Sequence, residues 1–322
     1  MTLAMLGMAL AAALTVGFAD GLTALLLGMA ALGGTYAAVQ SGGTRAIMRW
    51  FPPQHRGLAT GFRQAAVTLG TAIAAVALPM LAAWGGWQAA VWALAAVAAL
   101  GAALFRFGYR EGGAAPATAG GALPLRLLTR TLLATPPFLE VLLAGVAMSA
   151  FQFTLTAHAV PFVAEGLALG IAAGATLFAA AQIIGIPGRV LLPWLPDRIM
   201  AGQRPRALGI VMLASAGVAL AFAALGPGGS PVFFAALMLP LGLFGIGWFP
   251  LYILQIAEMA PKSSIASTVG LVTTLCMVVV ALGPFVFGLG VDVLGYPASW
   301  VLLTLPVIAS ATPLLRRARS AG

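Results

Sequence analysis

Two arginines inside long apolar stretches are the residues best placed to do chemistry. Arg63 lies five positions after Leu58, near the start of one stretch. Arg189 lies eight positions before Asp197, near the end of another. At the rise of an α-helix these offsets correspond to about 8 Å and about 12 Å. An arginine at such depth in a hydrocarbon layer is costly unless it faces water or a partner, so both are candidates for a functional role.

The chemistry that these arginines could perform is the binding of a small anion. The apolar stretches offer no carboxylate at similar depth, so an external anion could pair with each guanidinium. The planar fork of donors fits the oxygens of carboxylate, nitrate or cyanate-like anions. The alternative is that both side chains extend to the nearby membrane surface. Both interpretations stay open for Arg63, whereas the mid-span position of Arg189 favours binding.

Neutral polar side chains in the apolar stretches could complete such a site. One adjoins Arg63, two lie four residues apart on one helix face, and one precedes Arg189 by two turns. These residues are Gln64, Gln152, Thr156 and Gln182. His158 could exchange protons near neutral pH. The alternatives are that Thr156 bonds its own helix backbone and that His158 is only a packed side chain.

The composition predicts an integral membrane protein. Hydrophobic residues make up 61% of the 322-residue chain, charged residues make up 7%, and the mean hydropathy is +1.05. Too little polar surface remains to coat a soluble globule. The net charge of +9 comes from basic residues between apolar stretches, so it serves membrane topology and does not indicate nucleic-acid binding. No metal, nucleophile or phosphate-binding motif is present, so we expect neither an enzyme nor a cofactor.

Apolar stretches long enough to cross a bilayer, about 20 residues each, are predicted at ten places. They are rich in Ala, Leu, Val and Gly without strand-like alternation, so helices are expected. The predicted spans are 2–18, 22–48, 57–83, 87–107, 137–163, 168–194, 206–225, 231–257, 263–290 and 297–315.

The basic residues predict how these spans are oriented. The segment from Arg45 to Gln64 holds four of the sixteen Lys and Arg residues, and the remaining twelve fall in alternate connections on the same side. Lys and Arg collect in cytoplasmic loops. We therefore expect a multi-pass protein of the inner membrane with both termini in the cytoplasm and the lipid bilayer as its surroundings.

The longest connection divides the spans four and six. The predicted parts are an incomplete four-helix bundle over 1–107, a cytoplasmic central loop over 108–136 and a six-helix bundle over 137–322. Within the loop, Arg126 and Arg130 lie one turn apart among leucines, which favours an amphipathic helix on the inner membrane surface. An extension of the flexible linker is the alternative.

Three features of the chain carry a family resemblance. They are the motif R-W-F-P-P-Q-H-R-G-L-A-T-G-F-R-Q, which ends at Gln64, the central loop, and the motif G-R-V-L-L-P-W-L-P-D-R, which ends at Arg198. Together they resemble the major facilitator superfamily, and the first motif is similar to bacterial permeases of the cyanate, nitrate and monocarboxylate kind. The resemblance covers the family's third to twelfth helices. We therefore expect the reading frame to continue upstream with the first two helices.

The resemblance implies a secondary transporter, acting as a permease or symporter by alternating access. It implies that Asp197, with Arg198, forms a gate against the start of the span at Arg56 and Gly57, where a carboxylate gains from the helix dipole. An ordinary loop ion pair of Asp197 with Arg198 or Arg204 is the alternative. The expected solute is small and anionic, protons could be coupled to it, and the expected state is a monomer. A truncated membrane protein that transports nothing is the alternative function.

Overall fold

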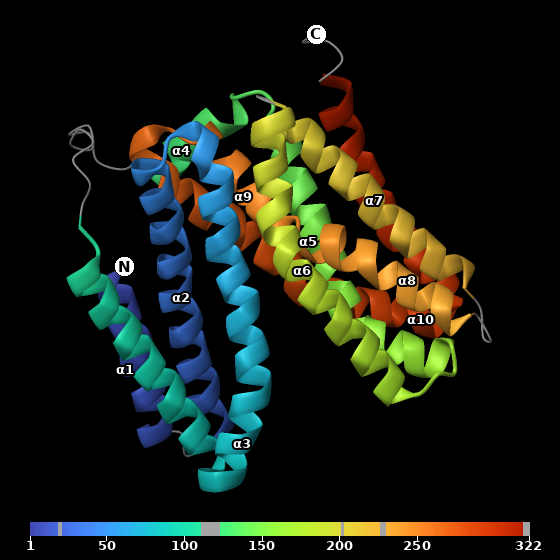
Figure 1. Cartoon of the computed structure of the whole chain (residues 1–322). Coiled ribbons are helices and arrows are strands. Elements are labelled where there is room, and N and C mark those ends of the chain that lie inside the picture. The colour runs from blue at the N-terminus through green and yellow to red at the C-terminus, as the bar shows by residue number, and fades with distance from the viewer. Residues whose placement is uncertain (19–20, 111–122, 201–202, 226–229, 318–322) are drawn as a thin grey trace.

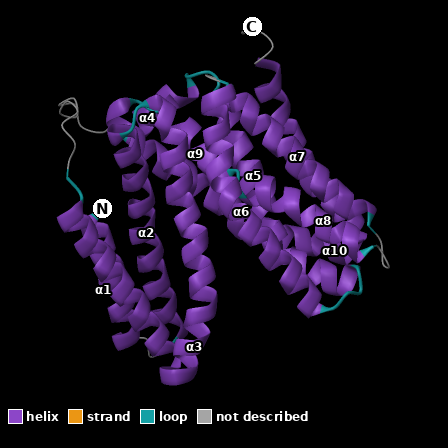
Figure 2. Cartoon of the chain, viewed as in Figure 1, coloured by secondary structure: helices purple, strands orange, loops and turns teal. Residues whose placement is uncertain are grey.

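The computed structural model is helical throughout the residues that it describes (Figure 2), which are 1–18, 21–110, 123–200, 203–225 and 230–317. No β-strand occurs within these ranges. The structure therefore agrees with the all-α membrane protein expected from composition, since in a bilayer a helix satisfies its own backbone hydrogen bonds.

The helices follow one another along the chain, and the longest connection lies between α3 and α4. In order they are α1 (Thr2–Phe18), α2 (Leu22–Trp50), α3 (Pro53–Gly108), α4 (Leu125–Leu133), α5 (Phe138–Pro161), α6 (Ile171–Ile199), α7 (Arg204–Ala224), α8 (Pro231–Pro240), α9 (Phe249–Met259) and α10 (Ile265–Arg317). Two π-helical turns, η1 (Phe162–Gly166) and η2 (Leu241–Ile246), each follow a proline, and the 3-10 turn η3 (Lys262–Ser264) precedes α10.

Seven helices of the described residues are long and apolar enough to cross a membrane, and α1 is a shorter apolar helix. Two of the long helices contain breaks in helical geometry. The φ angles of Gly86, in α3, and Gly295, in α10, are +72° and +77°, which glycine adopts without the cost of a Cβ. Both glycines fall in connections expected between consecutive spans, at 83–87 and 290–297. The number of ten crossings remains a prediction.

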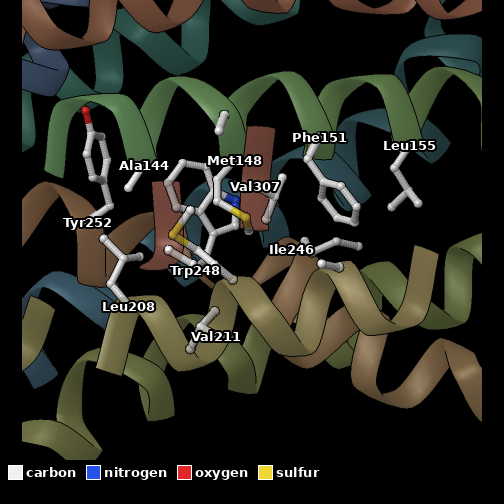
Figure 3. Close-up of a cluster of buried hydrophobic side chains, with 14 of the residues drawn as sticks. Ala144, Met148, Phe151, Leu155, Leu208, Val211, Ile246, Trp248, Tyr252 and Val307 are labelled. Carbon is white, nitrogen blue, oxygen red and sulfur yellow. The ribbon is translucent and has the colours of Figure 1, made fainter. Parts of the chain in front are cut away.

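The helices form two groups that are packed differently. Figure 1 shows α1, α2 and α3 together on one side, and α5, α7, α8 and α10 on the other. One continuous core of buried side chains runs through the second group, and Figure 3 shows its centre around Met148, Phe151, Trp248 and Tyr252. The buried cluster of the first group is small and is formed by Ala12, Val91 and Ala95. Helices of the first group therefore present most of their apolar side chains outward.

The short helix α4 packs against the main core. Leu128 and Leu132 are fully buried there, and the N–H of Leu123 donates to Ser264 Oγ at 3.1 Å. Arg126 and Arg130 lie exposed on the opposite face. A helix is thus present where an amphipathic one was expected, and its leucines contact protein. The division of the chain into two bundles and a central loop remains a prediction.

Close contact between α3 and α6 positions the candidate site. A Cβ on Gly57 would lie 2.3 Å from the carbonyl oxygen of Pro193, and one on Gly61 would lie 2.7 Å from that of Arg189. Both distances are too short for a side chain. The two glycines are four residues apart on one face of α3, and their missing side chains let the helices approach closely.

Candidate functional site

Arg63 points from α3 to α2. Its Nη1 donates to the backbone carbonyl of Gln40 at 3.1 Å, and its Nη2 donates to Thr44 Oγ1 at 3.0 Å. Gly43 makes room for it, because a Cβ at that position would lie 2.4 Å from Nη1. The guanidinium is partly buried and held by neutral groups. The sequence singled out Arg63 but none of these partners on α2.

Arg189 reaches the same place from α6. Its Nη1 lies 3.5 Å from the backbone carbonyl of Gln64, the residue next to Arg63. Gln40 donates a side-chain hydrogen bond to the Tyr36 hydroxyl. Two arginines that are 126 positions apart in the sequence therefore meet at one polar cluster, formed by α2, α3 and α6.

Several donors in this cluster lack a partner. The Nε atoms of Arg63 and Arg189, the Gln64 amide nitrogen and the Thr68 hydroxyl are buried without a hydrogen bond to any residue that the structure describes. None of the ion pairs found between described residues involves either arginine. Buried polar groups normally have partners, and an unpaired one costs free energy. The unpaired donors and the two positive charges make this cluster suited to an anion.

Two other candidate solute-binding residues, Gln152 and Thr156, have partners away from the arginines. Gln152 on α5 accepts a hydrogen bond at 2.8 Å from Trp248 Nε1, within the main core. The Thr156 hydroxyl donates to the backbone carbonyl of Gln152 at 2.8 Å, as the alternative interpretation of that threonine expected. Gln182 is partly buried on α6. No hydrogen bond of these three side chains with Arg63 or Arg189 is found in the described part of the chain.

His158 joins α5 to α10. Its Nε2 lies 2.9 Å from the backbone carbonyl of Pro284, and its ring centroid lies 4.7 Å from that of Phe287. The imidazole is partly buried between the two helices. This contact with a carbonyl requires a protonated Nε2, which both the neutral and the charged forms can supply.

Asp197, at the cytoplasmic end expected for α6, contacts the start of α3. The N–H of Gly57 donates to Asp197 Oδ2 at 3.1 Å, and Arg204 Nε donates to Oδ1 at 2.7 Å. The Asp197 side chain is 2% exposed. Arg204, the first residue of α7, also pairs with Glu258 near the end of α9. One carboxylate thus joins the first turns of α3 to a second ion pair through Arg204.

Arg56 belongs to this network and Arg198 does not. Arg56 Nη1 lies 3.8 Å from Glu258 Oε1, and its Nε and Nη2 donate to the carbonyls of Phe51 and Met48. The Arg198 guanidinium instead stacks on the Trp194 ring at 5.2 Å. We call Arg56, Gly57, Asp197, Arg204 and Glu258 the cytoplasmic network.

Sequence reasoning missed Arg204 and Glu258 as members of the cytoplasmic network. Arg204 had been assigned only to a basic loop, or to an ordinary ion pair with Asp197. The pair of Arg204 with Glu258 joins residues 54 positions apart, which no local motif connects. The two charges at the ends of expected spans were the only sequence signal. Among the described residues, no group of three or more His, Cys, Asp and Glu side chains could hold a metal ion.

Comparisons with known proteins identify the family. Residues 1–284 match the Major Facilitator Superfamily. Two uncharacterized MFS-type transporters of Mycobacterium tuberculosis, from strains CDC 1551 and H37Rv, are each 28% identical over 301 residues, which is 90% of this chain. The chain spans 63% of the length of these relatives.

Solved structures show the same fold. The Escherichia coli fucose:proton symporter superposes with a TM-score of 0.78 at 14% identity, over 98% of this chain and 82% of that chain. The human organic anion transporter MFSD10 superposes with a TM-score of 0.74 at 16% identity, over 97% of this chain and 76% of that chain. By its sequence match and its fold, the chain belongs to the major facilitator superfamily of membrane transporters.

Proposed function

We propose that this chain acts in a secondary transporter that moves a small anionic solute across the cytoplasmic membrane by alternating access. One observation supports the anionic solute most directly. The guanidiniums of Arg63 and Arg189 come from different helices to one cluster, without a carboxylate partner among the described residues. An uncompensated pair of charges inside a span is expensive, and a bound anion would offset that cost.

The residues of this chain, and not its fold, indicate the charge of the solute. Fold neighbours at this level of identity include a symporter named for fucose and a transporter named for organic anions. The shared fold thus accommodates solutes of different charge. In this chain, the polar groups that lack partners near the arginines are mainly hydrogen-bond donors, which match the acceptor oxygens of an anion.

The cytoplasmic network would act as the gate. It joins the start of α3 to the ends of α6 and α9 and the start of α7, so that relative movement of these helices must break it. Alternating access requires such contacts to form in one state and separate in another. Gly57 and Asp197 would close the gate, with Arg56, Arg204 and Glu258 supporting the carboxylate.

His158 is our candidate for proton coupling. An imidazole can take up and release a proton, and this one contacts α10 from α5 at a backbone carbonyl. A His158→Gln variant keeps an N–H donor but cannot carry a proton. It should retain solute exchange between loaded vesicles while losing the stimulation of uptake by an inward proton gradient. Unchanged stimulation would exclude this residue.

The proposed location is the inner membrane, with both termini in the cytoplasm and a monomer as the working unit. The one-sided distribution of Lys and Arg supports the orientation. Single cysteines at Ser230 and Asp292 should react with an impermeant thiol reagent added to intact cells, whereas one at Gly121 should not. Labelling at Gly121 alone would reverse the orientation.

The test of the anion site compares arginine with lysine. Arg63→Lys and Arg189→Lys keep the charge but lose the planar fork of donors. We expect each to lower anion uptake by about 10-fold or more, the loss expected for a charge-assisted hydrogen bond. Arg126→Lys, on the exposed face of α4, is the matched control and should change little. Normal uptake kinetics in both site variants, at equal expression, would contradict the proposed site.

A further inference from the structure

The polar cluster around Arg63 and Arg189, called the arginine cluster below, carries two positive charges, and this number indicates the charge of the solute that it would bind. Arg63 and Arg189 bring two positive charges together, and the carboxylates of Asp197 and Glu258 are paired with Arg204 in the cytoplasmic network. Arg63 is held by a carbonyl and a hydroxyl, which are neutral acceptors. A bound monoanion would therefore leave one of the two charges uncompensated inside a span, and that is costly.

The unpaired donors fall into two groups. Arg189 has a free Nε, and the single hydrogen bond found for its guanidinium is the long contact of Nη1 with the Gln64 carbonyl. Its fork is thus available to a carboxylate. On α3, the Arg63 Nε, the Gln64 amide and the Thr68 hydroxyl lack partners, and Gln64 and Thr68 lie four residues apart on one helix face. Gln64 is 1% exposed and Thr68 is 9% exposed, so a solute would reach them in a state in which the helices around them are more open.

From these two groups of donors and two charges, we propose that the site takes a dianion with two separate carboxylates, such as a short dicarboxylate. One carboxylate pairs with Arg189 on α6. The other pairs with Arg63 and accepts hydrogen bonds from Gln64 and Thr68 on α3. The inference rests on the proposed anion transport and specifies the charge class of its solute.

Binding to both helices would also link the solute to movement of the protein. α3 and α6 already touch closely at Gly57 and Gly61, next to both the arginine cluster and the cytoplasmic network. A dicarboxylate spanning Arg63 and Arg189 would hold these helices together with both charges compensated, whereas a monocarboxylate would compensate only one of the two charges. Such a difference in contacts is what lets a ligand shift a conformational equilibrium.

The experiment compares the two charge classes on the purified 322-residue chain in detergent, by isothermal titration at matched ionic strength. The probes are acetate and butyrate as monocarboxylates, and malonate, succinate and glutarate as dicarboxylates. We expect the best dicarboxylate to bind about 10- to 100-fold more tightly than either monocarboxylate, as one extra charge-assisted interaction predicts.

Variants assign this preference to the two arginines. Arg63→Gln and Arg189→Gln each remove one charge, so each should abolish the dicarboxylate preference while monocarboxylate binding falls less. Arg126→Gln is the control, because this arginine is exposed on α4. The melting temperature of each variant reports folding. Arg189→Gln should fold normally, since its guanidinium makes only one long hydrogen bond to described residues.

Each result decides between the two proposals. Equal binding of mono- and dicarboxylates to the unmodified chain, or a preference that survives in both variants, would overturn the dianion inference and leave anion binding intact. Binding of neither class would reject the anion site itself, and the dianion inference with it.

Discussion

The α1–α3 region and the α5–α10 region are built from equally apolar helices but are packed in different ways. In the most apolar stretch of α2 no residue is buried, whereas 56% of the corresponding stretch of α5 and η1 is buried. The α5–α10 region holds interlocking aromatic rings, such as Phe162, Phe222 and Trp300, while the α1–α3 region buries mainly alanine and valine. Apolar composition alone therefore does not indicate how closely a membrane helix is packed.

The two regions are stabilised by different contacts. Lipid tails are as apolar as leucine, so an exposed leucine on α2 costs little in a bilayer, and close packing supplies the stability of helix bundles there. The α5–α10 region has that packing within itself. The α1–α3 region depends more on its contacts with α6, α9 and α10, and the arginine cluster and the cytoplasmic network lie at those contacts.

The largest expected effect tests this packing difference with two phenylalanines. Phe222 is 1% exposed among the rings of Phe162, Phe234 and Trp300, and Phe107 is 83% exposed. Phe222→Ala should lower the free energy of unfolding by about 3 to 5 kcal/mol because it leaves a cavity. Phe107→Ala should change it by less than about 0.5 kcal/mol. Reversible unfolding in mixed micelles measures both, and equal losses would remove the distinction between the regions.

The second effect concerns the link between the regions at the cytoplasmic network. Arg204→Gln leaves the buried Asp197 carboxylate and Glu258 without their shared cation, and should destabilise the protein by about 1 to 3 kcal/mol. Arg198→Gln is the matched control, since Arg198 contacts Trp194 and no carboxylate among the described residues. If the network is a gate, Arg204→Gln should also raise the reactivity of a cysteine placed at Pro53 with thiol reagents from the cytoplasmic side.

The outcome of that comparison separates a gate from an ordinary ion pair. A stability loss without a change in thiol reactivity would mean that the network only holds the helices together. Equal behaviour of Arg204→Gln and Arg198→Gln in both measurements would show that the contact between the regions does not depend on these charges.

The third prediction concerns the close approach of α3 to α6. A side chain at Gly61 would meet the backbone of Arg189 and Val190, whereas nothing lies within 4 Å of a Cβ at Gly70, on the same helix. Gly61→Val should therefore cost about 1 to 3 kcal/mol through overpacking, and should lower uptake by moving the arginines apart. Gly70→Val should leave both measurements near those of the unmodified chain. Normal stability of Gly61→Val would show that the helices can separate freely.

These features differ in how far the sequence could predict them. Apolar stretches and Gly or Pro clusters predicted helices and the breaks near Gly86 and Gly295, because bilayer length and backbone freedom are local properties. Arg63 and Arg189 stood out because charge in a span is rare. Their meeting point at Gln64 and the partners Gln40 and Thr44 depend on how α2, α3 and α6 cross, which one sequence does not encode locally.

The partners of the polar residues on α5 were likewise not predictable from their spacing. Gln152 and Thr156 share a helix face, and spacing alone treats them alike. The structure separates them, because Gln152 bonds Trp248, the residue before α9, whereas Thr156 bonds its own helix. Long-range packing determines the partner of Gln152, and the short reach of a threonine hydroxyl determines the partner of Thr156.

The smallest expected effect follows from that separation. Thr156→Val removes a hydroxyl that bonds only the backbone of its own helix, keeps the shape of the side chain, and should change stability by less than about 0.5 kcal/mol. Gln152→Leu leaves the buried Trp248 N–H without a partner and should cost about 1 to 2 kcal/mol. Anion binding should survive in both, because neither side chain contacts Arg63 or Arg189 among the described residues. A loss of binding in Thr156→Val at normal stability would instead place α5 in the solute site, and would extend the functional cluster into the closely packed region.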